Sequence, residues 1–202
     1  MNPTDLPAPP LDRPALAEAT ARFTAAAAAT GAADLVYAQL DSPLGRLVAV
    51  ATPTGLAQLS YEDFRGGLDA VLEDLSVRLS PRIVEAPARL EDTQRQLEEY
   101  FDGRRTTFSI PLDWTLCGDF TRRILQATAQ IPFGATATYG AMAAAAGNPK
   151  ASRAAGRALG SNPIPIVVPC HRVIGTSGRL TGYTGGLERK IQLLQVEGIS
   201  LG

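Results

Sequence analysis

The sequence has very few of the residues that most often do chemistry in proteins. Of its 202 residues one is histidine and two are cysteine, and the cysteines are not spaced as C-x-x-C. This scarcity argues against zinc and against a disulfide framework, which both need several such side chains. The chain also lacks an apolar run of about 18 residues, the length that spans a membrane, and shows no secretory signal. We therefore expect a cytoplasmic protein without a metal, a cofactor or a membrane partner.

The single histidine directly follows one of the two cysteines. Cys170 and His171 lie in the segment 164–174, whose apolar run predicts a buried strand, and Pro165 and Pro169 predict a rigid platform there. A thiol becomes a good nucleophile at neutral pH when a base lies nearby, and imidazole is suited to that task. The pair is therefore a candidate nucleophile and base. The alternative is that Cys170 is a small core residue and His171 an ordinary hydrogen-bonded one.

Charge divides the chain into two unlike parts. Residues 1–118 carry 17 acidic and 10 basic side chains, whereas residues 119–202 carry 9 basic side chains and only 3 acidic ones. Such asymmetry indicates that one face or domain meets a polyanion; the alternative is ordinary scatter of surface charge. The Cys-His pair lies in the basic part, so the candidate chemistry and the cationic surface coincide.

The order of patterns predicts an α+β protein in three regions. Residues 1–33 form an Ala/Pro-rich region in which 11–30 fit an Ala-rich helix or a loosely held tail equally well. Residues 34–113 fit a small domain of antiparallel sheet and helices without visible chemistry. In this domain we expect strands at 36–40, 47–50, 56–61 and 106–112, and helices at 68–79 and 88–101.

Residues 114–202 fit a mostly helical domain. Helical spacing occurs at 120–131, 139–146 and 150–159, and the last two stretches are joined by Gly147-Asn148-Pro149. Two short helices with a tight Gly-containing turn predict a helix-turn-helix. The second of them has small side chains apart from Arg153 and Arg157. Small residues permit close approach to a DNA backbone or minor groove, but they also suit an Ala-rich core helix.

Six short motifs follow one another with tight spacing in this half. They are Tyr139-Gly140, Gly147-Asn148-Pro149-Lys150, Arg153-Ala154, Asn162-Pro163, Pro169-Cys170-His171-Arg172-Val173 and Gly182-Tyr183-Thr184-Gly185-Gly186. Together they resemble the O6-alkylguanine-DNA alkyltransferases, the methylated-DNA–protein-cysteine methyltransferases, over 114–198 and more loosely back to Leu35.

The resemblance implies a fold and a reaction. The N-terminal domain would be ribonuclease H-like and the C-terminal domain winged-helix-like. The protein would repair double-stranded DNA by minor-groove binding and base flipping. It would then transfer an alkyl group, such as methyl, from O6 of guanine or O4 of thymine to its own Cys170, once per molecule. A monomer without a cofactor is expected.

The resemblance also assigns roles residue by residue. Cys170 would be the alkyl acceptor and His171 the base that removes its proton, through a water because neighbours on a strand point to opposite faces. Glu197 would orient His171, and Tyr139 would crowd the target phosphate and protonate the departing guanine. Arg153 would replace the extruded base. The remaining assignments are DNA contacts at Lys150, Ser152, Ala154, Gly156 and Asn162, with Asn162 tying the recognition helix to the cysteine segment, and pocket walls at Pro165, Val173, Tyr183 and Thr184.

Some features depart from the family pattern or leave other classes open. Thr121 and Ala135 replace a usual glutamine and acid at scaffold positions, and Cys117, without a nearby histidine, is interpreted as structural. The N-terminal half has no zinc ligand set, so a methyl-sensing regulator is not expected.

Two other functional classes stay open. The first is a cysteine hydrolase that uses Cys170 and His171, which would turn over repeatedly. The second is a damage-recognition protein without transfer chemistry, which would not need the thiol.

Overall fold

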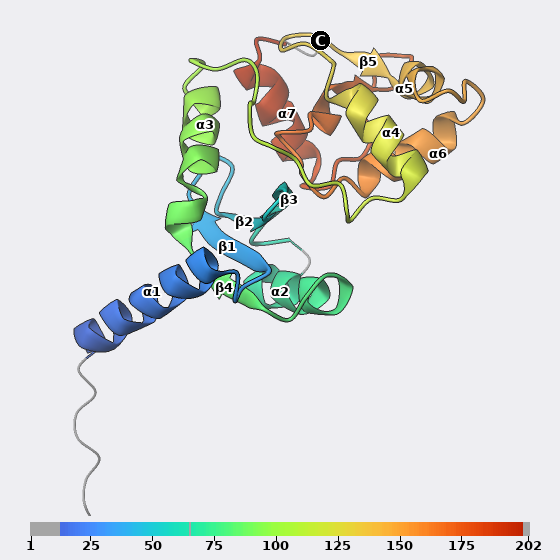
Figure 1. Ribbon diagram of the computed structural model, residues 1–202. Coiled ribbons are helices and arrows are strands. Elements are labelled where there is room, and N and C mark those ends of the chain that lie inside the picture. The colour runs from blue at the N-terminus through green and yellow to red at the C-terminus, as the bar shows by residue number, and fades with distance from the viewer. Residues whose placement is uncertain (1–12, 65, 200–202) are drawn as a thin grey trace, which may run out of the picture.

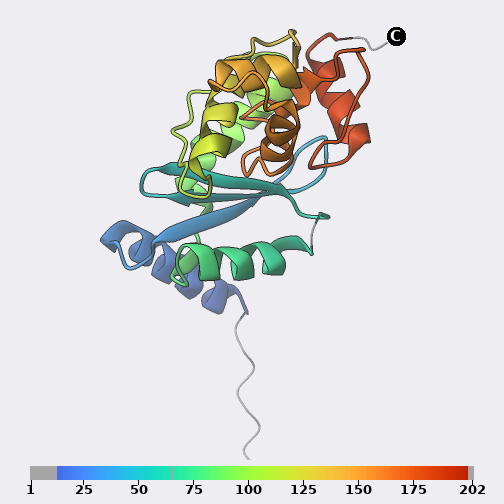
Figure 2. The same cartoon turned by 90° about the vertical axis from the view of Figure 1, so that its right-hand side faces the viewer.

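The computed structural model describes residues 13–64 and 66–199, in which a four-stranded sheet is covered by helices on both faces (Figures 1 and 2). Strands β1 (Leu35–Leu40), β2 (Leu47–Thr52) and β3 (Gly55–Tyr61) form an antiparallel meander. Strand β4 (Ile83–Glu85), which the sequence pattern did not reveal, pairs parallel with β1 and gives the order β3-β2-β1-β4. The predicted meander is confirmed.

The central strand β2 shows why helices must cover both faces of the sheet. Its residues Leu47 to Val50 are all fully buried, and alternate side chains belong to two different clusters. Val48 and Val50 pack toward α2 (Gly67–Arg78), which lies beneath the sheet together with α1 (Arg13–Thr30) (Figure 2). The Ala-rich stretch is thus helical over 13–30, and residues 1–12 lie outside the described part.

The opposite face of the sheet meets the second half of the chain. The short 3₁₀ turn η1 (Pro87–Arg89) and helix α3 (Glu91–Phe101) lead toward it (Figure 1). The predicted strand at 106–112 is wrong. This segment is a loop with a single bridge between Leu112 and Leu56. Pro111 has no N–H, and the N–H of Ser109 donates to the side chain of Gln96 instead of a strand.

The second half is mostly helical, as predicted. It contains α4 (Asp119–Thr128), β5 (Ala137–Thr138), α5 (Tyr139–Ala145), α6 (Ser152–Gly160), η2 (Cys170–Arg172), β6 (Val173–Ile174) and α7 (Leu187–Val196). Thr138 caps α5 by accepting a hydrogen bond from Ala141, and Gly147 with φ of 82° follows the end of that helix. The two short helices of the expected helix-turn-helix are therefore confirmed.

The segment 164–174 is buried as predicted, but only its last two residues, Val173 and Ile174, form a strand, β6. Turn-type bonds such as Val168 N–H to Ile164 O hold it, and the cysteine and histidine share the 3₁₀ turn η2. Two prolines remove the donors that a sheet would need. Ile166 has a φ of 73°, which is rare for a β-branched residue and is held here by complete burial. Cys170 and His171 therefore do not point to opposite faces of a strand.

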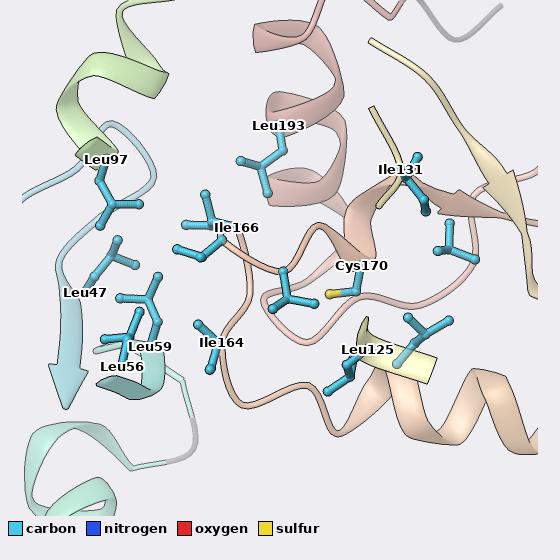
Figure 3. Packing of buried hydrophobic residues seen from close by; sticks show 14 of the residues in the cluster. Leu47, Leu56, Leu59, Leu97, Leu125, Ile131, Ile164, Ile166, Cys170 and Leu193 are labelled. Carbon is cyan, nitrogen blue, oxygen red and sulfur yellow. The ribbon is translucent and has the colours of Figure 1, made fainter. Parts of the chain in front are cut away.

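One continuous apolar core fixes this segment between the sheet and the helices. It extends from sheet residues such as Leu47 and Leu59, across Ile164 and Ile166, to Cys170 (Figure 3). Close packing of this kind leaves the cysteine segment little freedom to move. In the part of the chain described, no helix combines the length and apolar character needed to cross a membrane.

Candidate active site

A buried carboxylate lies at the centre of a hydrogen-bond cluster at the end of α7. Glu197, 4% exposed, accepts from His171 Nε2 at 2.8 Å, from Arg172 Nε at 2.9 Å and from the Tyr100 hydroxyl at 2.7 Å. Burial raises the pKa of Glu197, but the hydrogen bonds from His171 and Arg172 outweigh it and hold the pKa at about 2. The carboxylate is therefore ionised at neutral pH.

The ionised Glu197 sets the tautomer of the completely buried His171. A carboxylate can only accept, so Nε2 carries the proton and Nδ1 has the free lone pair. Nδ1 is also the one buried side-chain nitrogen or oxygen without a hydrogen-bond partner among the described residues. Burial lowers the pKa of His171 despite the neighbouring carboxylate. The ring is thus a neutral base with one unused acceptor.

The thiol of Cys170 is held by an amide rather than by the imidazole. Asn162 Nδ2 lies 3.2 Å from Sγ and 2.9 Å from the Val168 carbonyl, and its Oδ1 accepts from Ile164 N–H. Cys170 is 5% exposed, and burial raises its pKa to about 11 although Asn162 acts in the opposite direction. The thiol is therefore protonated at rest and must lose its proton during a reaction, and His171 is the base expected from the sequence to remove it.

A buried lysine on α7 is a site residue that the sequence did not reveal. Lys190 is fully buried and donates to the carbonyls of Val173, at 2.6 Å, and Thr181, at 3.2 Å. Its charge favours the thiolate of Cys170. In the sequence Lys190 is one of several basic residues, and nothing there distinguishes it from a surface cation.

An open cavity of about 610 Å³ lies beside the segment 181–184. Its walls come from α5, α6, the segment 181–184 and the N-terminal half; they are Phe64, Tyr139, Ser152, Arg153, Gly156, Gly160, Thr181, Gly182, Tyr183 and Thr184. The Tyr139 hydroxyl lies 2.5 Å from Thr181 Oγ1, and the Tyr183 ring packs edge-on against His171 with centroids 6.4 Å apart. The Tyr183 wall therefore connects the cavity with the buried base.

The structure brings together most, but not all, of the predicted site residues. Tyr139, Ser152, Arg153, Gly156, Tyr183 and Thr184 line the cavity. Cys170, His171, Asn162 and Glu197 are buried and do not line it; Asn162 contacts Cys170, and Glu197 contacts His171. Pro165 and Val173 are buried and do not line the cavity, nor do the exposed Lys150 and the half-buried Ala154. Among residues 13–64 and 66–199, no group of His, Cys, Asp or Glu is arranged to hold a metal ion.

The small residues of α6 serve both purposes that the sequence left open. Ala155 and Ala158 are buried against the core, whereas Ser152, Arg153 and Gly156 face the cavity. The helix can thus approach a ligand closely on one side while it packs on the other.

The N-terminal half contributes to the site, contrary to the expectation that it holds no chemistry. Tyr100 on α3 donates to Glu197, and Tyr61 at the end of β3 lies 3.0 Å from the Tyr183 hydroxyl. Both residues belong to apolar patterns in the sequence, where a phenol hydroxyl is indistinguishable from ordinary core packing. Only the contact between the halves identifies them.

Substitution of Asn162 tests the support of the thiol. We expect Asn162→Ala to lower the free energy of unfolding by about 2–4 kcal/mol, because the buried Val168 carbonyl and Ile164 N–H lose their partner. The pKa of Cys170 should also rise further. Urea unfolding and thiol titration measure the two effects, with the exposed Asn148→Ala as control. Equal stability of the two variants would contradict a structural role for the amide.

Comparison with known proteins gives consistent matches over both halves. The profile of the "6-O-methylguanine DNA methyltransferase, ribonuclease-like domain" matches residues 35–114, and that of the "6-O-methylguanine DNA methyltransferase, DNA binding domain" matches residues 119–199. A methylated-DNA–protein-cysteine methyltransferase of Mycobacterium leprae is 42% identical over 159 residues, covering 78% of this chain and 89% of the relative. The constitutive enzyme of that name from Bacillus subtilis is 40% identical and covers 81% and 96%.

Solved structures agree with these matches. The O6-methylguanine methyltransferase of Mycobacterium tuberculosis superposes with a TM-score of 0.69 at 38% identity, covering 81% of this chain and 92% of that one. A structure of the Mycobacterium tuberculosis protein in complex with DNA gives the same score and identity. A protein from Pyrococcus kodakaraensis, 23% identical with a TM-score of 0.58, shares the fold.

Proposed function

The chain belongs to the 6-O-methylguanine DNA methyltransferase family of DNA-repair enzymes, and from this premise we propose that Cys170 is the residue that accepts the alkyl group. The observation that carries the proposal is the neutral His171, which has its Nε2 proton fixed on Glu197 and its Nδ1 lone pair unused. Such a ring can accept a proton from a buried thiol at neutral pH.

The proposed reaction is displacement at a saturated carbon. Sγ of Cys170 forms a bond to the alkyl carbon while the bond between that carbon and O6 of guanine breaks, and the electron pair stays on the base. The product is a thioether and an unmodified guanine. No oxidant, reductant or further reactant is required. Since a thioether is a poor leaving group, each molecule would act once.

Two protons must move during this reaction. The proton of the Cys170 thiol would pass to His171 Nδ1 through a water, because no direct hydrogen bond joins the two residues among those described. The departing guanine would take its proton from the Tyr139 hydroxyl on the cavity wall. The lysine charge at position 190 would favour the transient thiolate, and Glu197 would stabilise the imidazolium.

The cavity would receive a guanine, or an O4-alkylated thymine, turned out of the DNA duplex. Its open shape, the exposed Arg153 at its edge and the small side chains of α6 support minor-groove approach and base flipping. Lys150, Ser152, Ala154 and Gly156 would contact the DNA around Arg153. We further propose that residues 34–113 and 114–202 are the two domains and that the protein acts as a monomer.

Intact-mass measurement tests this function. The protein is incubated with duplex DNA that contains O6-methylguanine, and its mass should increase by one methyl group in place of one hydrogen. Peptide mapping should locate the change at Cys170, and further DNA should add nothing. Release of methylated product beyond one equivalent, or modification at Cys117 instead, would overturn the proposal.

Arg153 is expected to matter for duplex substrates only. Arg153→Ala should slow methyl transfer from duplex DNA by about tenfold or more. Without the arginine, no side chain would take the place that the flipped base leaves in the duplex. Attack on free O6-benzylguanine should change less than twofold. Single-turnover rates on both substrates measure the effect. Arg157→Ala, on the same helix but outside the cavity lining, is the matched control. Equal slowing on both substrates would contradict a role in flipping.

A further inference from the structure

A tyrosine of the N-terminal half is enclosed by the segment that forms one wall of the cavity. Tyr61, the last residue of β3, is 1% exposed. Its hydroxyl lies 3.0 Å from the hydroxyl of Tyr183, and the two rings meet edge to face with centroids 6.4 Å apart. A Cβ added to Gly185 would lie only 2.3 Å from Cε2 of Tyr61. The wall segment is thus closely fitted to this single side chain.

Arg189 completes the enclosure from α7. Its guanidinium lies over the Tyr61 ring, 4.2 Å from the centroid, while Nη2 donates to Asp63 at 2.6 Å and Nε to the Leu44 carbonyl at 3.0 Å. A cation over an aromatic face, together with these donated bonds, is a directed contact rather than general packing. Three hydrogen bonds therefore attach the segment 183–189 to the N-terminal half. They join Tyr183 to Tyr61, and Arg189 to Asp63 and to the Leu44 carbonyl.

Tyr183 links these contacts with the N-terminal half to the proposed base, His171. Its ring lines the cavity and packs edge-on against His171. Burial of the Tyr183 hydroxyl raises its pKa well above the ordinary value, so the group remains a neutral donor or acceptor that needs a partner. Tyr61 is the hydrogen-bond partner that the fold provides.

We propose that Tyr61 is a positioning residue for alkyl transfer, which holds the Tyr183 wall against His171 across the contact between the two halves. The inference rests on the proposed function, because it takes Cys170 as acceptor and Tyr183 as pocket wall. A hydroxyl left without a partner at this place turns toward water in the cavity and takes the ring with it. A wall displaced in this way misaligns the base with the buried thiol, so transfer slows.

A double-mutant cycle of Tyr61→Phe and Tyr183→Phe tests the proposal. Removal of one hydroxyl leaves the other unpaired, which is expected to slow transfer about tenfold. Removal of both leaves two packed rings without an unpaired group. The double variant should therefore transfer several times faster than the product of the two single effects implies. Single-turnover rates of methyl transfer from duplex DNA and of benzyl transfer from free O6-benzylguanine are measured, with DNA affinity and thermal unfolding alongside.

A positioning role predicts equal coupling on both substrates and unchanged DNA affinity. The control cycle pairs Tyr183→Phe with Tyr37→Phe, which removes a hydroxyl from the same sheet on the face packed toward α2. Its two effects should simply multiply. If Tyr61→Phe does not fold, Asp63→Asn at the exposed end of the Arg189 contact should still slow transfer about twofold.

The possible failures are distinguishable. Absence of transfer to Cys170 in the unaltered protein overturns the proposed function. Normal transfer in the unaltered protein with independent effects of Tyr61→Phe and Tyr183→Phe overturns the role of Tyr61 alone. Coupling seen with duplex DNA but not with the free base also overturns it, because DNA binding would then be the affected step.

Discussion

Replacement of Cys170 by serine is expected to abolish alkyl transfer and to leave affinity for duplex DNA within about twofold. A hydroxyl is far less acidic and less nucleophilic than a thiol, and the neutral His171 cannot compensate for that difference. Serine also retains an acceptor for the Asn162 amide, so the fold should persist. Intact mass after incubation with methylated DNA, and binding measured by fluorescence anisotropy, give the two results.

The second cysteine provides the matched control for this prediction. Cys117 is half-buried near the start of α4, and Cys117→Ser should transfer at the rate of the unaltered protein. A mass increase in Cys170→Ser protein, or its loss in Cys117→Ser protein, would show that the acceptor has been assigned to the wrong sulfur.

Glu197→Gln is expected to have the largest combined effect on stability and activity. The change leaves the buried Arg172 guanidinium without its counter-charge, which should cost about 3–5 kcal/mol of unfolding free energy. It also removes the carboxylate that fixes the His171 tautomer, so transfer should slow about 100-fold or more. Urea unfolding and single-turnover kinetics measure the two effects. Glu188→Gln, an exposed change on the same helix, should alter neither.

The pH dependence of stability follows from the same carboxylate. Its folded pKa of about 2 lies below the ordinary value for an unfolded chain, so its contribution is present at neutral pH and disappears as the pH falls from about 4.5 to 2. That contribution is on the order of 3 kcal/mol. Unfolding free energies measured across this range should fall more steeply for the unaltered protein than for Glu197→Gln. Parallel curves would contradict the assignment.

Local patterns determined much of the secondary structure. The alternation of residues 35–61 with Gly and Pro turns predicted the meander, and helical spacing predicted α2 and α4 to α6, because these signals depend on near neighbours. The predictions failed at β4, at 106–112 and at 164–172. In these segments partners distant in the sequence help to decide the conformation, such as β1 for β4 and the Glu197 side chain for His171 and Arg172 of the cysteine segment.

The sequence by itself determined the identity of the candidate nucleophile and base, the charge division and, through its motifs, the resemblance to alkyltransferases. The tertiary structure alone decided the protonation states and the supporting residues. It buries Cys170 so that its thiol is protonated at rest, it ionises Glu197 beside Arg172, and it brings Tyr61 and Tyr100 across from the other half. The physical reason is that a pKa depends on burial and on charges nearby in space, and neither can be read from neighbours along the chain.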